Sequence, residues 1–518
     1  MNFKKIFLAV AIVCGAASSV NAGGILTNTN QSVSFLRNPA REAAIGIDGV
    51  YSNPAGVAFM NNGFHLGLNW QAGWQTRTVE TTSPFLDPTL QAVMGKAEAP
   101  TKSYRGHTAV PCIPSLQAAY NTDKWSYQFS FAVAGGGGSC EFTKGIGTFD
   151  NAVGQIAARM APLGVMGYGA DSYMEGKQYY FGVTMGAAYK VNENLSVYGG
   201  LRGMIASANY IAKINDIVVS SVDGLEHMGQ FMDKKNAYLS GVIAQTKPYY
   251  DAYATQYPAL KALVESGKAT AEHKALVQAI EGYQTAVGAQ AALGQLDGYR
   301  NGINLESNQS GFGIAPIIGV DYKIGAFNFA AKYEFRTAMS LENSSNLPEA
   351  TLAATGTFVD GSKVREDVPA FLAIGAQYSP IDIVRINAGY HHYYDRKAKK
   401  TYYYTDEAGA AVRSDFKNCL LKHGTNEYLG GVEVDLTKRL TVSSGFQITR
   451  YGNTEEYISD ISFVVDSWSF GFGASYQAND NVKLEAAYFQ TTYDHFKTTS
   501  SDFTRTASVI GVGCEISF

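Results

Sequence analysis

The sequence predicts an all-β fold, a 14-stranded antiparallel transmembrane β-barrel with an N-terminal hatch in its lumen and a helical insertion in one extracellular loop. Three observations predict this fold. Many segments alternate strictly between apolar and polar or small residues, charged residues fall on the polar side of that alternation, and short turns alternate with long loops. Successive strand residues point to opposite faces, so each such segment has one apolar and one polar face.

The N-terminus has the pattern of a secretory signal peptide. Two lysines precede an apolar run from Ile6 to Val13, and small residues follow. The run is too short to cross a bilayer, so we expect residues 1–22 to be removed and Gly23 to begin the mature chain. A lipoprotein signal at Cys14 is the alternative. It fits less well, because the residue before this cysteine is a valine inside the apolar run.

Composition excludes several classes of protein. The net charge of −4 and the pI of about 6.1 give no basic field for nucleic acid. The mature cysteines Cys112, Cys140, Cys419 and Cys514 lack C-x-x-C spacing, so neither a metal site nor a cofactor is predicted. An oxidising compartment would permit a disulfide, and Cys112 with Cys140 is the candidate pair. The mature chain has no apolar run long enough for a transmembrane helix.

The alternating segments are best explained by strands that face lipid. Two examples run from Phe64 to Trp74 and from Trp468 to Tyr476. A soluble β-sandwich would also alternate, but here the apolar parity is nearly free of charge. A lysine or arginine facing lipid at the bilayer midplane costs roughly 2–4 kcal/mol. The charged residues on the polar parity are Arg202, Asp321, Lys332, Glu334, Arg385, Glu433, Lys483, Glu485 and Glu515.

The connections between these segments set the strand number. Six short polar turns alternate with seven longer loops, at about 82–111, 142–172, 215–304, 342–366, 405–424, 453–460 and 498–501. Thirteen connections join 14 strands, so the barrel is expected over residues 63–518. Five of the short turns follow a tyrosine on the apolar parity, which predicts an aromatic girdle at one interface. Those tyrosines are Tyr120, Tyr189, Tyr322, Tyr378 and Tyr476.

Residues 23–62 do not have a strand pattern. Two Asn-Pro pairs, Asn38-Pro39 and Asn53-Pro54, mark fixed corners because the residue before proline avoids the helical region. A short helix is expected between them, over Ala40–Gly46. The segment is either a periplasmic linker or a plug folded in the lumen. The plug is favoured, because a 14-stranded barrel is wide enough to leak without one.

The chain resembles the FadL family of outer-membrane transporters for long-chain fatty acids, which includes TodX-type importers of aromatic hydrocarbons. The resemblance rests on the signal peptide, the strand number, the C-terminal Phe518 and a hatch that ends in Asn53, Pro54, Ala55 and Gly56 directly before the first strand. It covers the whole mature chain except the long insertion. It implies a monomer in the outer membrane of a Gram-negative bacterium that passively imports hydrophobic small molecules, without enzymatic activity or cofactor.

The resemblance also gives a meaning to a run of glycines in the third segment, Gly135, Gly136, Gly137 and Gly138. In the family the third strand is kinked and leaves an opening in the wall. Glycine weakens a strand and marks a bulge or bend. We expect a lateral gate here, through which solute leaves sideways after the hatch moves. A plain flexible loop is the alternative. A phosphate-binding loop is disfavoured, since no Walker-type helix follows.

Two loops have a helical pattern. Within 146–166, Phe149, Val153, Ile156, Ala157, Met160 and Leu163 form an apolar stripe. In the family the corresponding loop builds the first hydrophobic groove, so Phe149, Ile156 and Met160 are candidate ligand contacts. Simple packing on the barrel rim is the alternative. The insertion 215–304 carries two further stripes: Tyr249, Tyr253, Tyr257, Leu260 and Val264, broken near Pro258, and then Leu276, Ile280, Tyr283, Val287 and Ala291. They predict two antiparallel helices that pack on each other, or else a lid or partner site.

An anionic ligand would need a cation once water is excluded. The inward-facing candidates are Arg202, Lys332, Arg336 and Arg385. Acidic neighbours on the same parity are expected to neutralise most of them. These four side chains therefore remain candidates for a ligand carboxylate rather than a defined site.

Other functions fit parts of the sequence. A general porin would have an open lumen, which the plug disfavours. A surface-binding protein would use the long insertion. An outer-membrane esterase or protease could use His391 or His65 as a base, although no G-x-S-x-G or H-E-x-x-H pattern is present and no catalytic residue is assigned.

Overall fold

The computed structural model describes residues 31–90, 95, 98–347, 358–405, 411–414 and 420–518. The predicted signal peptide and residues 23–30 of the predicted hatch lie outside this part of the chain. Among the described residues, no helix combines the length and the apolar character that a bilayer span requires.

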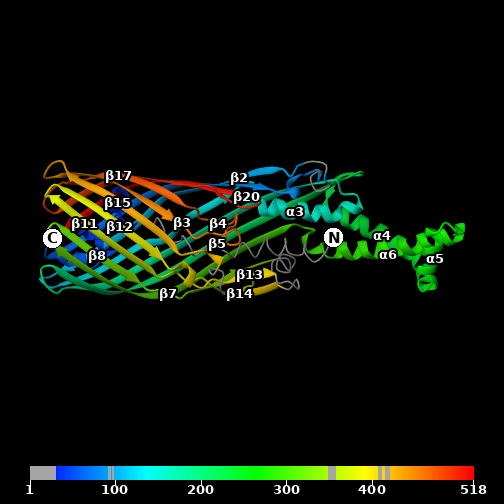
Figure 1. Ribbon diagram of the computed structural model, residues 1–518, viewed down its shortest axis with the longest axis horizontal. Helices are drawn as coiled ribbons and strands as arrows, with labels where there is room; N and C mark the ends of the chain where they lie inside the picture. The colour runs from blue at the N-terminus through cyan, green and yellow to red at the C-terminus, as the bar shows by residue number, and fades with distance from the viewer. Residues whose placement is uncertain (1–30, 91–94, 96–97, 348–357, 406–410, 415–419) are drawn as a thin grey trace.

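The strands form one closed antiparallel ring of fourteen positions (Figure 1). Each strand pairs with the next along the chain, and the last pairs with the first. In order they are β1 (Gly63–Thr82), β2 (Thr101–Asn121), β3 (Trp125–Phe142), β4 (Gly167–Lys190), β5 (Leu195–Ser221), β7 (Ile303–Ile324), β8 (Phe327–Glu334) extended by β9 (Ser340–Ser345), β11 (Phe371–Ile381) preceded by β10 (Lys363–Arg365), β12 (Val384–Tyr393), β15 (Thr425–Asp435), β16 (Leu440–Arg450), β17 (Ser467–Gln477), β18 (Val482–Tyr493) followed by β19 (Phe496–Lys497), and β20 (Ser501–Ser517).

The two ends of the sheet join through its terminal aromatic residues. Phe64 and Phe518 exchange backbone hydrogen bonds of 3.2 and 2.9 Å, and their rings stack with centroids 6.3 Å apart. This contact leaves neither β1 nor β20 as a free edge, where unpaired backbone groups would be costly in lipid. The predicted 14-stranded barrel is confirmed.

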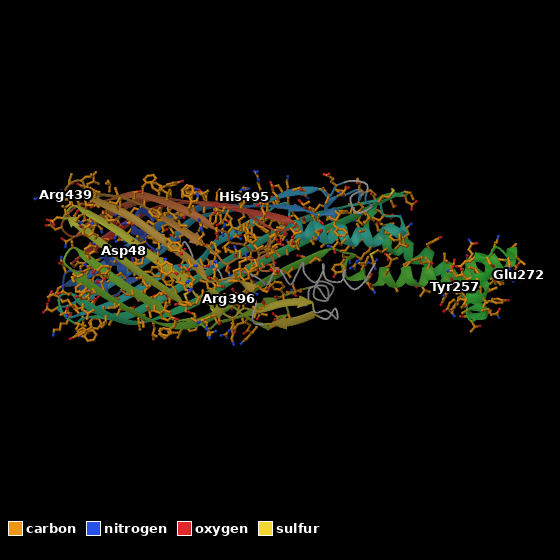
Figure 2. The ribbon with its side chains drawn as sticks, in the orientation of Figure 1. Asp48, Tyr257, Glu272, Arg396, Arg439 and His495 are labelled. Carbon is orange, nitrogen blue, oxygen red and sulfur yellow. The ribbon has the colours of Figure 1, made fainter. Side chains whose placement is uncertain are left out.

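The outer surface has the predicted apolar parity. Trp74, Phe312 and Trp468 have relative exposures of 50, 59 and 50%, whereas inward-facing Arg202, Asp321 and Glu334 are buried. Aromatic side chains gather beside the short turns, where Trp125 contacts Tyr189 and Phe327 contacts Tyr378 at 4.8 and 4.6 Å between centroids. In Figure 2, Arg439 marks this turn end and Glu272 marks the opposite extreme of the molecule.

The barrel is taller on one side than the sequence pattern indicated. The loop predicted at 82–111 ends at residue 100, because β2 begins at Thr101 and pairs with β1 up to Thr82. The loops expected from 142 and 215 are likewise shortened by β4 and β5, which have 24 and 27 residues. The strands on the other side, β11, β12, β15, β16, β17 and β18, have 10 to 12 residues. At about 3.3 Å per residue, the longer strands extend well above them.

The loops carry the helices. The loop between β3 and β4 contains α3 (Gly147–Met160) and η5 (Ala161–Leu163), and η4 (Pro84–Leu86) lies in the preceding loop. After β5 come β6 (Gly224–His227), α4 (Met228–Tyr253), α5 (Tyr257–Glu265), α6 (Ala271–Gly294) and η6 (Asp297–Tyr299). A short 3-10 helix η7 (Asp395–Lys397) and a small sheet of β13 (Tyr402–Thr405) and β14 (Ala411–Ser414) follow β12.

The insertion projects from the loop end as three helices, with α4 packed along α6 and α5 beside α6 (Figure 1). The first predicted stripe, residues 249–264, falls across the break between α4 and α5, so packed helices form but with other boundaries than expected. Gly267, with a φ of +72°, follows α5, and Thr270 caps α6 through a capping box. The predicted stripe on α6 is shifted in part: Val277, Ile280 and Ala286 are buried, whereas Val287 is 40% exposed. The face turned toward α4 therefore differs from the stripe that the spacing indicated.

Candidate functional site

The N-terminal segment 31–62 lies inside the ring of strands. It contains α2 (Val33–Arg37), η2 (Ile47–Val50) and η3 (Gly56–Phe59). Its residues form hydrogen bonds with side chains of β1, β2, β3, β5, β7, β8, β12, β15, β16 and β18. A segment can reach strands all round a closed ring only from within it.

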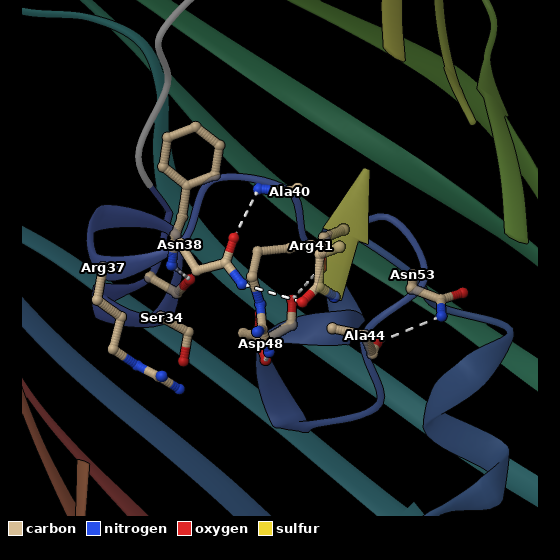
Figure 3. Close-up of polar contacts among 12 residues, drawn as sticks. Ser34, Arg37, Asn38, Ala40, Arg41, Ala44, Asp48 and Asn53 are labelled. Carbon is tan, nitrogen blue, oxygen red and sulfur yellow. Dashed lines mark hydrogen bonds and ion pairs between the residues drawn. The ribbon is translucent and has the colours of Figure 1, made fainter. Parts of the chain in front are cut away.

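Part of this segment follows a different path from the one expected. The helix predicted over Ala40–Gly46 does not form; helical turns precede and follow it instead. Arg41 turns back to pair with Asp48 at 2.8 Å, and this short-range ion pair holds 40–46 as a bend (Figure 3).

Buried ion pairs attach one side of the segment to the wall. Arg37 lies 2.9 Å from Glu433 on β15 and 3.1 Å from Glu485 on β18. Arg41 reaches the same Glu433 at 3.0 Å. His391 on β12 contacts Glu42 of the segment at 2.7 Å. Removing one partner of a buried pair is strongly destabilising, typically by about 3–5 kcal/mol, so these contacts hold the segment firmly.

The Asn-Pro-Ala-Gly motif attaches the other side. Asn53 donates to Asp321 on β7 at 2.5 Å, and its own side-chain oxygen accepts from the Gly56 amide at 3.1 Å. The carbonyl oxygens of Pro54 and Ala55 accept from Gln128 on β3 and Ser196 on β5, at 2.7 and 2.6 Å. The motif thus turns the chain and presents its carbonyl groups to polar side chains of the wall.

Glycines on the inner wall make room for the segment. A Cβ added at Gly471 on β17 would lie 2.0 Å from the carbonyl oxygen of Leu36, and one at Gly431 on β15 would lie 2.0 Å from Asn38 Oδ1. Real Cβ atoms do not approach so closely. The glycines on the inner face of these strands therefore leave the space that the segment occupies.

The strand pairing between β2 and β3 is interrupted in the middle of the wall. Their ladder runs from Asn121 opposite Ser126 to Ser115 opposite Ala132, and it resumes only at His107 opposite Glu141. The predicted glycines lie in this interval of β3, where bulges interrupt pairing with β4 on both sides of Gly135–Gly136. Gly136 has a φ of +72° and Gly138 of +142°, which other residues rarely adopt.

The facing interval of β2 gives a second signal, which the sequence analysis missed. It contains Pro111 and Pro114, which have no backbone N–H to donate across the gap. The β1–β2 ladder also shifts register between Gln71 and Gly73. Both strands that border the opening are therefore irregular at the same level.

A cavity of about 270 Å³ lies behind this opening. Its lining includes Gly135, Gly136 and Gly138 of β3 and Phe463 of the loop between β16 and β17. An outer hollow shares Trp74, Gln75, Thr108 and Ser508 with this cavity. Because Trp74 is half exposed on the outer surface, the two hollows meet at the wall.

The predicted cations are already engaged by the protein. Arg202 pairs with Glu334 at 2.7 Å, Arg336 pairs with Asp367, and Arg385 pairs with Asp435 at 2.6 Å. Lys332 bonds to the carbonyl of Tyr51 and lies 4.1 Å from the centre of its ring. None of the four lines the 270 Å³ cavity. Contact with a ligand at these four side chains stays a prediction.

The α3 stripe is buried in the loop region. Phe149, Ile156 and Met160 have relative exposures of 1, 3 and 0% and pack with residues of β2, β4 and β5. The burial fits the second interpretation of the stripe, in which it packs the loop on the barrel rim. A ligand could contact these side chains only if the loops moved. Asp460 fixes the start of the helix by accepting from the Thr148 amide at 2.7 Å. Burial raises the pKa of the Asp460 carboxyl above its usual value.

The predicted disulfide is absent. Cys112 is exposed and Cys140 is buried, and both are free thiols. They lie on the two strands that flank the opening, and the interrupted ladder leaves them without the direct pairing that a disulfide would need.

Two further inward cations escaped the sequence analysis, Arg77 on β1 and Arg505 on β20. Both line the 270 Å³ cavity. The alternation within each strand could have placed each arginine on the inner face. It could not have shown that the two face each other, because β1 and β20 come from opposite ends of the chain.

The fold and the site together define a class: a closed β-barrel with a segment folded in its lumen and an interrupted strand pairing in its wall. No family model and no curated protein matches the sequence. Solved structures do. A FadL homologue from Pseudomonas aeruginosa aligns with a TM-score of 0.57 at 11% identity, over 96% of this chain and 100% of that one.

Two hydrocarbon channels align similarly. The toluene transporter TbuX of Ralstonia pickettii has a TM-score of 0.52 at 13% identity, over 95% of this chain and 99% of its own. A TodX mutant, described as a monoaromatic hydrocarbon channel, has a TM-score of 0.55 at 11% identity, over 94% and 99%. The chain therefore has the fold of the FadL-type barrels, as the sequence resemblance implied.

Proposed function

We propose that this chain is a passive channel in the outer membrane of a Gram-negative bacterium that imports hydrophobic small molecules, long-chain fatty acids among them. The single observation that carries the proposal is the interrupted β2–β3 ladder, with a cavity that is partly lined by aromatic residues behind it and an outer hollow in front. The FadL-type fold supports it, since two structures that share this fold are described as a toluene transporter and a monoaromatic hydrocarbon channel.

In this mechanism the solute leaves sideways. Each CH₂ group exposed to water costs about 0.8 kcal/mol, so a path from the cavity into the bilayer avoids the water-filled periplasmic end. The glycines of β3 contribute no side chains there, so Val110 and Thr108 of β2, which lie against Gly138, are the side chains that would have to move for the path to open. Passage follows the concentration gradient and no bond is broken.

The N-terminal segment acts as the hatch. Its buried ion pairs and its fit against inner glycines support a closed resting state. Ligand in the cavity would reach it through Phe489, which lines the cavity and lies 5.9 Å from the ring of Phe35 in the segment. A shift of Phe489 is therefore the shortest route by which binding could move the hatch.

Uptake by cells tests the function directly. The chain would be produced in a Gram-negative host that lacks its own uptake protein for long-chain fatty acids, and entry of labelled oleate, toluene and maltotriose would be measured. We expect faster entry of at least one hydrophobic solute and no change for the sugar. Faster entry of the sugar alone would identify a general porin and overturn the proposal.

A further inference from the structure

Arg77 and Arg505 face each other directly across the β1–β20 ladder. Both side chains point into the barrel, since Val79 and Phe503, two residues further along the same faces, are buried there. Neighbouring side chains at such positions have Cβ atoms roughly 4.5–5.5 Å apart, and like charges placed there are destabilising. The pair therefore lowers stability unless an anion lies between or beside the two guanidinium groups.

No acidic side chain of the described residues supplies that anion. Neither arginine has a carboxylate within 4.0 Å, and the Nε atom of each is buried without a hydrogen-bond partner. Arg505 donates only to neutral oxygens, the Gln75 side chain at 2.6 Å and the Phe463 carbonyl at 3.3 Å. Arg77 lies 5.9 Å from the ring of Phe463.

The contrast with the other inward arginines is clear. Arg37, Arg41, Arg202 and Arg385 each pair with a carboxylate at 3.1 Å or less. A carboxylate of the protein thus neutralises each of these four arginines. Arg77 and Arg505 differ from them: two guanidinium groups lie opposite each other and neither has a carboxylate partner among the residues that the structure describes.

Aromatic and aliphatic side chains line part of the cavity around the pair, beside neutral polar residues such as Gln71 and Thr491. The same cavity is lined by Phe463, Phe489 and Tyr493 on one side and by Val133 and the β3 glycines on the other. At about 270 Å³ it is close to the lower end of small-molecule sites, roughly 300 Å³. A guanidinium fork matches a carboxylate, and aromatic walls suit a hydrocarbon body.

We propose that Arg77 and Arg505 bind the carboxylate of an amphipathic organic acid whose hydrocarbon part lies along the aromatic wall toward the β3 opening. This inference rests on the proposed function and narrows it: the site favours monocarboxylic acids over neutral hydrocarbons. Binding the head group would offset the repulsion between the two arginines, so an occupied cavity is more stable than an empty one.

Binding measurements on the full-length mature barrel in nanodiscs test the site. The ligands are octanoate and octanol, which differ in the head group, and titration calorimetry gives their affinities. We expect octanoate to bind at least tenfold more tightly than octanol. Arg77→Gln and Arg505→Gln should each weaken octanoate about tenfold, and the double variant should bind the two ligands alike. Arg439→Gln, on a turn at the far end, is the matched control.

The outcomes separate this site from the function. Octanoate binding that survives in the double variant would overturn the inference, as would an equal loss of octanol binding. Octyl phosphate bound in place of octanoate would also overturn it, by identifying a phosphate site. The melting temperature of the single variants should stay the same or rise, because a repulsion is removed. Should cells take up no hydrophobic solute while the purified barrel still binds octanoate through these arginines, the transport proposal fails and the site stands.

Discussion

Nη1 of Arg37 lies 2.9 Å from Oε1 of Glu433, which joins the segment inside the lumen to a strand of the opposite half of the chain. Both side chains are almost completely buried, and Arg37 reaches Glu485 as well. One arginine thus bridges two strands of the wall. Buried ion pairs of this kind hold the segment in its place inside the ring of strands.

Replacing this arginine is expected to loosen the hatch. Arg37→Ala leaves Glu485 buried with fewer donors and should lower the stability of the closed state by about 3–5 kcal/mol, the usual effect of breaking a buried pair. Planar-bilayer conductance should increase, and cells should become sensitive to large antibiotics. The control is Lys190→Ala, which removes an exposed pair with Glu193. Unchanged conductance in the Arg37 variant would show that the segment is not held by this contact.

A single methyl group on the inner wall should have a similar effect. Gly471→Ala places a Cβ against the backbone of Leu36, and overpacking of this kind typically costs about 1–3 kcal/mol. Gly199→Ala on β5 meets no atom within 4 Å and is the matched control. We expect faster proteolysis of the N-terminal segment in the first variant only. Equal proteolysis of both variants would contradict the close fit.

The outer half of the insertion should be dispensable for transport. Gln290 on α6 donates to Asn236 on α4 at 2.8 Å, so the two helices can be joined at this level by a short glycine linker with residues 237–289 removed. The inner part, with Phe231 and Met232 buried on the rim, remains. Uptake of labelled oleate should stay within twofold of the full chain. A folded barrel that has lost uptake would instead make the insertion part of the solute path.

The barrel could be predicted from the sequence because its signals are local. Alternation from Phe64 to Trp74 needs only the period of a strand, and the alternation of short turns with longer loops set the strand number. The upper parts of β2, β4 and β5 were missed because they alternate weakly there and face loops rather than lipid. The sequence predicts a helix at 40–46, where the structure has a bend. The ion pair between Arg41 and Asp48 that holds the bend leaves no periodic pattern in the sequence.

The site could be predicted only in outline. The glycine run indicated where the wall is irregular, and the two Asn-Pro corners indicated a folded segment in the lumen. The opening itself also depends on Pro111 and Pro114 of the facing strand. Arg77 and Arg505, which have no carboxylate partner among the described residues, are not among the four candidates, because which arginine finds a carboxylate depends on the register of strands far apart in the chain.

Lateral release is the central claim, and a reversible cross-link across the opening tests it most directly. A Cβ at Gly138 would lie 3.9 Å from the Cβ of Val110, within the range of about 3.5–4.5 Å that disulfides require. Val110→Cys with Gly138→Cys, in a chain that also carries Cys112→Ser and Cys140→Ala, would join β2 to β3. Gly138→Cys alone in the same background controls for backbone strain. Oxidation should reduce oleate uptake to background and a reductant should restore it, whereas full uptake through a barrel shown to be cross-linked would mean that solute leaves by another path.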